Sequence, residues 1–199
     1  MKKYLILTFV IVILGVFGTR IWLGSNATIY NTSTAIQELA KWVENPDETI
    51  IEIIDDELYI QEAIGSTGST LKYPLELKGN FRLTFQLLSL TQKSSLKFIL
   101  QKDNNKYEVE IGITPQTSSV KLSKNSLSLI EKNGIVIQPN KYYTVSLENN
   151  NNELSFYINE TDILKMNISA QAFELKISMH GLPSSPAAFK IRDFEVCVF

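Results

Sequence analysis

The chain has 199 residues, of which 44% are hydrophobic and 20% charged, as expected for one globular domain with an additional segment. Its formal net charge of −2 provides no basic field for a nucleic-acid backbone, so that class of partner is excluded. The single cysteine, Cys197, excludes an intrachain disulfide, and the single histidine, His180, excludes a clustered His/Cys metal site.

The N-terminus has the pattern of an export signal. Lys2 and Lys3 precede an uncharged apolar run over residues 4–18, and three more apolar residues after Arg20 extend the stretch to residues 4–23. An arginine near the end of a membrane helix can extend its side chain to the membrane–water interface, so Arg20 does not have to end the span. Residues 4–23 together are therefore long enough to cross a membrane. Residues 1–24 are therefore predicted to be an uncleaved signal anchor or a cleaved signal peptide. The rest is predicted to lie outside, either on a single-pass cell-membrane protein or on a secreted one.

Residues 25–33 are polar and are predicted to form a linker to a folded domain over residues 34–199. Thr34 and Gln37 match a capping box, so a short amphipathic helix is expected to begin there. From Thr49 onward the apolar period changes from 3.6 to 2, which indicates strands. The strands predicted from this alternation cover residues 49–54, 57–61, 81–87, 96–100, 107–113, 142–147, 154–158, 173–179 and 189–198.

The predicted strands between residues 81 and 179 each have one apolar and one polar face, which is typical of antiparallel sheets covered on one side. Short Asn- and Asp-rich clusters separate the strands and suit hairpin turns. No helix of useful length interrupts the strands. The predicted fold class is therefore all-β, a sandwich of two antiparallel sheets that follows the hydrophobic N-terminal helix and the short amphipathic one.

The last strand changes parity at Arg192-Asp193, which indicates a β-bulge. Beyond this point Cys197 and Phe199 point opposite to Val196 and Val198, and both pairs are apolar. A strand that is apolar on both faces belongs inside a sheet with cover above and below. The C-terminus is therefore predicted to lie beside the first strands, with extra cover from the helix that carries Trp42.

Five segments together resemble the laminin-G-like or concanavalin A-like jelly-roll superfamily of lectins and glucanases. They are "DDELYIQ" (55–61), "GNFRLTFQL" (79–87), "YEVEIG" (107–112), the double hairpin 140–166 and "FKIRDFEV" (189–196). The turn after the strand 154–158 is Asn159-Glu160, whereas that family usually has Asp-Gly or Asn-Gly there. The resemblance implies a jelly roll whose last strand lies next to the first, and it fits many activities.

Calcium is left open by this resemblance, because laminin-G-like domains often bind it at a loop edge. The loop acids available are Asp55, Asp56, Asp103 and Asp162, but no segment has a calcium-loop spacing. Turn chemistry explains these acids equally well. No cofactor and no metal ligand are therefore predicted.

Glu108 and Glu110 are the best catalytic candidates, although weak ones. Two residues apart on a strand, their carboxylates project from one face about 6.6 Å apart along the backbone. That separation is permissible for glycoside hydrolysis. Concanavalin-like glycosidases carry a strand motif of this kind with a further acid, which is missing here. Exposed glutamates on an amphipathic strand are the simpler interpretation.

A nucleophilic triad is not expected, because strand spacing does not present the Ser178 hydroxyl to the His180 imidazole as a base requires. Cys197 is expected to act as a small buried hydrophobe. Sugar binding would use exposed aromatic platforms. Tyr142 and Tyr157 lie opposite the predicted core, where adjacent strands could bring them together with Arg82.

The favoured hypothesis is a non-catalytic recognition module outside the cell, with carbohydrate or another cell-surface protein as its partner. The first alternative is a glycoside hydrolase or sugar-modifying enzyme of the same fold. The second is a structural module for envelope assembly.

Overall fold

The computed structural model describes residues 36–37, 40–66, 68–73, 76–135, 137–169 and 172–199. The predicted leader and linker lie outside these residues, as does most of the predicted amphipathic helix. The described remainder of that region includes two 3-10 helices, η1 (Ala40–Trp42) and η2 (Pro46–Glu48). Within the described ranges, no helix is long and apolar enough to cross a membrane.

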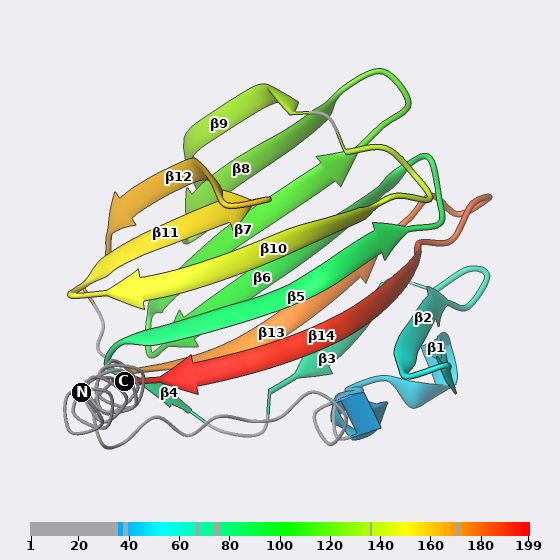
Figure 1. The fold of residues 1–199 in the computed structure, drawn as a ribbon, viewed down its shortest axis with the longest axis horizontal. Coiled ribbons are helices and arrows are strands. Elements are labelled where there is room, and N and C mark those ends of the chain that lie inside the picture. Colours follow the sequence, from blue (N-terminus) through cyan, green and yellow to red (C-terminus); the bar gives the residue numbers. More distant parts are fainter. Residues whose placement is uncertain (1–35, 38–39, 67, 74–75, 136, 170–171) are drawn as a thin grey trace, which may run out of the picture.

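The described chain folds into two antiparallel sheets that face each other (Figure 1). The β14 sheet has the order β1-β2-β14-β5-β10-β11-β12, and the β13 sheet has the order β3-β13-β6-β7-β8-β9, with β4 also paired to β13. The strands are β1 (Thr49–Ile54), β2 (Glu57–Glu62), β3 (Ser69–Lys72), β4 (Leu77–Lys78), β5 (Phe81–Ser89), β6 (Ser94–Lys102), β7 (Asn105–Ile113), β8 (Ser118–Lys124), β9 (Leu127–Ile135), β10 (Tyr142–Asn150), β11 (Glu153–Ile158), β12 (Thr161–Asn167), β13 (Ala172–His180) and β14 (Ala188–Val198). The predicted all-β, two-sheet antiparallel sandwich is confirmed.

The core lies between the sheets and is formed by the side chains on the predicted apolar face of the strands. Phe85 of β5 and Phe98 of β6 meet across the sandwich with ring centroids 5.8 Å apart, and Phe98 is equally close to Phe156 of β11. All three rings are buried. Because side chains alternate along a strand, the polar residues between these positions form the two outer faces.

The predicted bulge in β14 is present. Arg192 pairs with Gln86 of β5, and Glu195 pairs with Thr84. The chain thus advances three residues in β14 but only two in β5, so β14 contains one extra residue. Asp193 adopts a left-handed φ of 52° at this point. The extra residue returns Phe194 to the inner face, where it stacks on Phe85 with centroids 5.9 Å apart.

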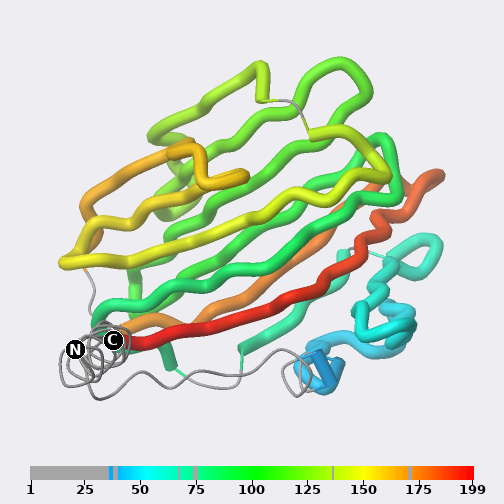
Figure 2. Tube along the Cα trace, viewed as in Figure 1, coloured from blue at the N-terminus to red at the C-terminus, as the bar shows by residue number. Residues whose placement is uncertain are grey.

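The C-terminal strand lies between β2 and β5, inside the sheet as predicted (red in Figure 2). However, β2 pairs only with its first half, Ala188–Ile191, because β2 is too short to continue past the bulge. The predicted cover on both faces is therefore wrong for the last residues, and Phe199 is 53% exposed. Trp42 instead packs at the inner edge, with ring centroids 4.9 Å from Tyr73 and 6.2 Å from Phe194.

Two tight turns fix the register of the hairpins β10–β11 and β11–β12. Asn151 and Asn152 have φ of 51° and 67°, and Asn159 and Glu160 have φ of 47° and 64°. Two consecutive positive φ values belong to a type I′ turn, whose twist suits a hairpin. Glu160 therefore occupies a position where glycine is preferred, and the hairpin forms without it.

Candidate functional site

The outer face of the β14 sheet carries all three predicted ligand-binding residues. Arg82 lies on β5, Tyr142 begins β10, and Tyr157 lies on β11 opposite Ser146. Tyr142 and Tyr157 are thus on neighbouring strands but four residues apart in register, about 14 Å between backbones. The structure places them on one face but does not bring them side by side.

Tyr142 belongs to a closed polar network between β2, β14, β5 and β10. Its hydroxyl donates a hydrogen bond to Glu57 Oε1, and the Arg192 guanidinium covers its ring at 3.8 Å from the centroid. Arg192 Nε and Nη2 also donate to Gln86 Oε1 at 3.0 and 2.8 Å, and Lys190 Nζ donates to Glu57 Oε2 at 3.0 Å. The Tyr142 hydroxyl and one ring face are therefore already engaged.

Two pKa values are shifted within this network. The hydrogen bond from Tyr142, followed by contact with Lys190, lowers the pKa of Glu57 despite its partial burial. Burial, followed by the hydrogen bond to Glu57, raises the pKa of Tyr142 to about 12. Both shifts favour one pairing, a phenol that donates to a carboxylate, so the network is stable near neutral pH.

Tyr157 is in a different situation. It is half-buried, and its side chain makes no hydrogen bond or ring contact with any other residue that the structure describes. Its cross-strand neighbours on the outer face are Ser146 of β10 and Asp162 of β12. Asp162 Oδ2 in turn forms an ion pair with Lys165 Nζ at 2.9 Å. An aromatic ring without a partner is thus surrounded by hydrogen-bonding groups.

Arg82 and Glu148 border the same area on the side of β5. Arg82 Nε and Nη2 both donate to Glu148 Oε2, at 2.9 and 2.6 Å. The Arg82 side chain is 55% exposed, so it can contact a ligand while remaining paired. Its backbone lies two strands and two residues from Tyr157, about 12 Å away. We call this area the Tyr157 platform, which consists of Arg82, Ser146, Glu148, Tyr157, Asp162 and Lys165.

The weak catalytic candidates lie on the opposite side of the sandwich. Glu108 and Glu110 project from the outer face of β7 in the β13 sheet. Each has a lysine partner, Lys106 Nζ at 2.8 Å from Glu108 and Lys97 Nζ at 3.6 Å from Glu110. The next outward position on the strand is Gly112, so the strand supplies no third acid.

The outer face of the β13 sheet otherwise carries mainly lysine, glutamate and hydroxyl side chains, with Ile99 among them. One row runs from Ser178 of β13 through Lys97, Glu110 and Lys121. No phenylalanine, tyrosine or tryptophan of the described chain points outward from this sheet. Only the β14 sheet therefore offers tyrosines for stacking on its outer face.

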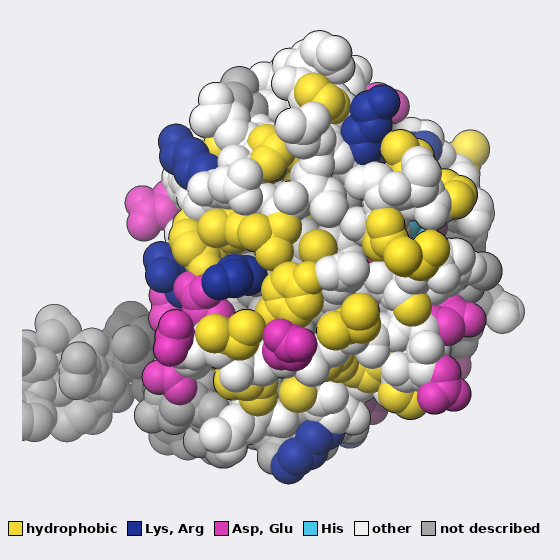
Figure 3. Space-filling model, turned by 90° about the vertical axis from the view of Figure 1, so that its right-hand side faces the viewer, with side chains coloured by type: hydrophobic (Ala, Val, Ile, Leu, Met, Phe, Trp, Pro, Cys, Tyr) yellow, Lys and Arg dark blue, Asp and Glu magenta, His cyan; other side chains and the backbone are white. Residues whose placement is uncertain are grey.

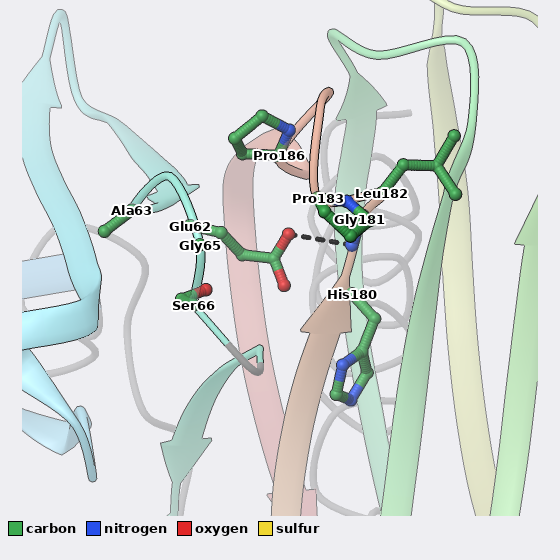
Figure 4. Close-up of a pocket in the computed structure, with 9 residues that line it drawn as sticks. All are labelled: Glu62, Ala63, Gly65, Ser66, His180, Gly181, Leu182, Pro183 and Pro186. Carbon is green, nitrogen blue, oxygen red and sulfur yellow. Dashed lines mark hydrogen bonds between the residues drawn. The ribbon is translucent and has the colours of Figure 1, made fainter.

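A small pocket of about 100 Å³ lies at one end of the sandwich (Figure 4). Glu62, only 5% exposed, accepts hydrogen bonds there from the backbone N–H groups of Gly181 at 2.7 Å and Ala187 at 2.6 Å. This buried carboxylate ties the β13–β14 loop to β2. Sequence reasoning did not single out Glu62, which directly follows the predicted strand 57–61.

The expectation that Ser178 and His180 stay apart is wrong, because Ser178 Oγ lies 3.2 Å from His180 Nε2. The imidazole bends back along the strand face, which is possible because Gly68 has no side chain to occupy that space. Ser178 is buried and also contacts the Thr70 hydroxyl at 3.2 Å. Apart from Ser178, no described residue forms a hydrogen bond with the imidazole, so nothing orients it as a general base.

A second pocket is lined by Asn149 and by the asparagine-rich loops beside it. The Asn149 side chain is buried, and its amide donates to the carbonyl of Gly79 at 2.7 Å. Its Oδ1 has no partner among the described residues. The asparagine run 149–152 suggested only a turn, so sequence reasoning did not single out this position.

The remaining candidates have structural explanations. Asp55, Asp56 and Asp103 adopt positive φ of 52–61° in hairpin turns, and Asp162 pairs with Lys165. No group of three metal-ligating side chains occurs among the described residues. Burial, followed by the hydrogen bond to a neighbouring glutamate, raises the pKa of the Cys197 thiol to about 11, so it stays protonated at neutral pH.

No protein-family model and no curated protein sequence matches this chain. Solved structures do match. A Crh5 transglycosylase in complex with NAG has a TM-score of 0.66 at 6% identity, covering 87% of this chain and 84% of that one. The carbohydrate-binding module CBM66 from Bacillus subtilis has a TM-score of 0.52 at 11% identity, covering 71% and 88%.

A sialidase also matches, with a TM-score of 0.56 at 13% identity. The match covers 77% of this chain but only 16% of the sialidase. At such identities the similarity concerns the fold. Together with the two antiparallel sheets, it confirms the predicted two-sheet jelly-roll fold.

Proposed function

We propose that this protein is a carbohydrate-binding module that recognises a glycan without cleaving it. The observation that carries the proposal is the Tyr157 ring, which lies on the outer face of a sheet among hydrogen-bonding side chains and makes no side-chain hydrogen bond or ring contact within the described residues. An aromatic face suits the apolar face of a sugar ring, while Ser146, Asp162 and Arg82 can bind its hydroxyls. Similarity of the fold to a carbohydrate-binding module supports the same role.

The enzyme alternative has one observation in its favour, the shared face of Glu108 and Glu110. Similar folds in a transglycosylase and a sialidase keep this alternative open. Three features weigh against it. Both carboxylates are paired with lysines, Gly112 takes the next outward position, and neither glutamate lines the Glu62 or Asn149 pocket.

The test is a glycan array probed with the full-length protein and three variants. Tyr157→Ala is expected to weaken binding by about thirtyfold, because truncating an aromatic anchor costs about 2 kcal/mol. Tyr157→Phe keeps the ring and should retain binding. Tyr59→Ala, at the far end of the same face, is the matched control. If Tyr157→Ala binds glycans as well as the wild type while remaining folded, the Tyr157 platform is not the site.

Catalysis is tested on the glycan that the array identifies. The expected result is no increase in reducing ends on prolonged incubation with the protein. The variant Glu108→Gln/Glu110→Gln should bind this glycan as the wild type does. Cleavage that disappears in the double variant would establish the enzyme instead.

The proposed location is the outer side of the cell membrane, with residues 4–23 as the tether. This part of the proposal rests on the two lysines followed by the apolar run. Protease treatment of intact cells should remove the domain and leave a membrane-bound N-terminal fragment. Protection of the domain from protease, or its recovery in the medium without residues 1–24, would contradict the tether.

A further inference from the structure

One end of the β14 sheet is open and apolar. Among the described residues β1 pairs only with β2, and on its free side the one backbone hydrogen bond is from the Thr49 N–H, where the strand begins, to the Pro46 carbonyl. Ile50, Ile53 and Ile54 are each 44% exposed. Hydrophobic and acidic side chains are both spread over this side of the molecule in Figure 3, on which Figure 1 places β1 and β2.

The other edges are protected in ways that β1 is not. The pairing of β12 is interrupted by a register shift, and that strand carries Lys165. The pairing of β9 shifts register twice, and that strand carries Lys132. The short strand β3 is covered by Val43 and Glu44, which bond to its free side. Lysines, bulges and covering segments are the usual protection of strand edges. Within the part of the chain that the structure describes, β1 has no lysine, no register shift and no segment paired along its free side, so this edge is suited to another strand.

The charges around β1 indicate what kind of strand could pair with its free edge. Residues 46–71 contain seven acidic residues and no lysine or arginine. Glu52 lies in the middle of β1, Asp47 and Glu48 precede the strand, and Asp55 and Asp56 form the turn that ends it. The free edge therefore combines isoleucines with negative charge along its whole length.

A second copy of this chain fits the shape of the edge but not its charge. The stretch "IIEII" reads the same in both directions, so two antiparallel copies could pair isoleucine with isoleucine. That register places Glu52 opposite Glu52 of the other copy, and each acidic turn next to the acids that precede the other strand. Like charges directly opposite each other destabilise a strand pair. The acids thus disfavour self-association at this edge.

We propose that β1 accepts an extended, basic segment of a partner protein, which adds an eighth strand to the β14 sheet. Main-chain hydrogen bonds would provide affinity, and the isoleucines would contact β-branched side chains on alternate positions. A lysine or arginine of the segment would face Glu52. This site is distinct from the Tyr157 platform, since β1 and β11 are five strand spacings apart, about 24 Å.

The probe for this proposal is a labelled peptide of alternating valine and threonine with lysines at its centre and both ends. Fluorescence anisotropy with the full-length protein in neutral detergent should show saturable binding of this peptide. A peptide with glutamate in place of each lysine should not bind. Ile50→Lys should weaken binding at least tenfold, whereas the control Leu129→Lys, at a 45% exposed position on β9, should leave it unchanged.

The decisive variant is Glu52→Lys, which should lose the basic peptide and gain the acidic one. Hydrogen exchange should show that the bound peptide slows exchange of β1 amides and leaves those of β12 unchanged. Equal binding of the two peptides, or protection elsewhere, would overturn the proposal. So would a wild-type dimer that Ile50→Lys dissociates, because the second copy would then be the occupant.

Discussion

Replacing Phe194 by alanine tests the most unusual local feature of the fold, the change of side-chain parity at the bulge. Phe194 is only 1% exposed and stacks on Phe85, and Trp42 approaches its edge. Truncation of such a buried ring to alanine costs about 3–5 kcal/mol. Without the extra residue, Phe194 would face outward beside Arg192, and its removal would cost little.

The matched control is Phe199→Ala, the same chemical change at a position that is 53% exposed. Exposed substitutions usually change stability by less than about 0.5 kcal/mol. Urea unfolding followed by far-ultraviolet circular dichroism should give the two values, with the slope m unchanged between variants. A loss below about 1 kcal/mol for Phe194→Ala, or equal losses in the two variants, would refute the bulge and the parity argument.

Three further predictions concern Asp193, Glu57 and Tyr142. Asp193 has a φ of 52°, so Asp193→Val should lose about 1–2 kcal/mol in urea unfolding, whereas Asp193→Gly should not; equal losses would contradict a left-handed conformation. The stabilisation from the lowered pKa of Glu57 is present above its ordinary value of 4.5 and is lost as pH falls through the lowered value. Glu57→Gln should therefore flatten the acid limb of stability against pH, and an unchanged limb would speak against the network. The ultraviolet absorbance of tyrosinate should show that Tyr142 ionises near pH 12 in the wild type and closer to pH 10 in Glu57→Gln. The same titration in both proteins would also speak against the network.

Strict alternation found most of the strands, and the strands that it missed have physical reasons. β8 offers only Val120 and Leu122 as buried apolar residues between polar ones, which is too short a pattern to stand out. In β12 the adjacent residues Ile163 and Leu164 are both buried, because a register shift breaks the pleat. β9 is an edge strand with no buried position and only two half-buried ones, Ile130 and Ile135, so it has little apolar face to detect.

For the candidate site, the sequence predicted the face of each residue but not its neighbours. Alternation places Tyr142 and Tyr157 on the outer face, but the Asn151-Asn152 turn determines which residues lie opposite each other. The contact between Arg192 and Tyr142 requires β14 to lie next to β5, which in turn pairs with β10. These pairings join segments far apart in the chain, and no local pattern encodes them.

The most direct measurement is an NMR titration of isotope-labelled full-length protein with the glycan that the array identifies. If Tyr157 stacks on the sugar, the largest amide shift changes should occur at Tyr157, at Ser146 and Asp162 on the flanking strands, and at the Arg82 side chain. Shift changes centred on Glu108 and Glu110 would instead place the sugar on the opposite sheet and contradict the proposed recognition site.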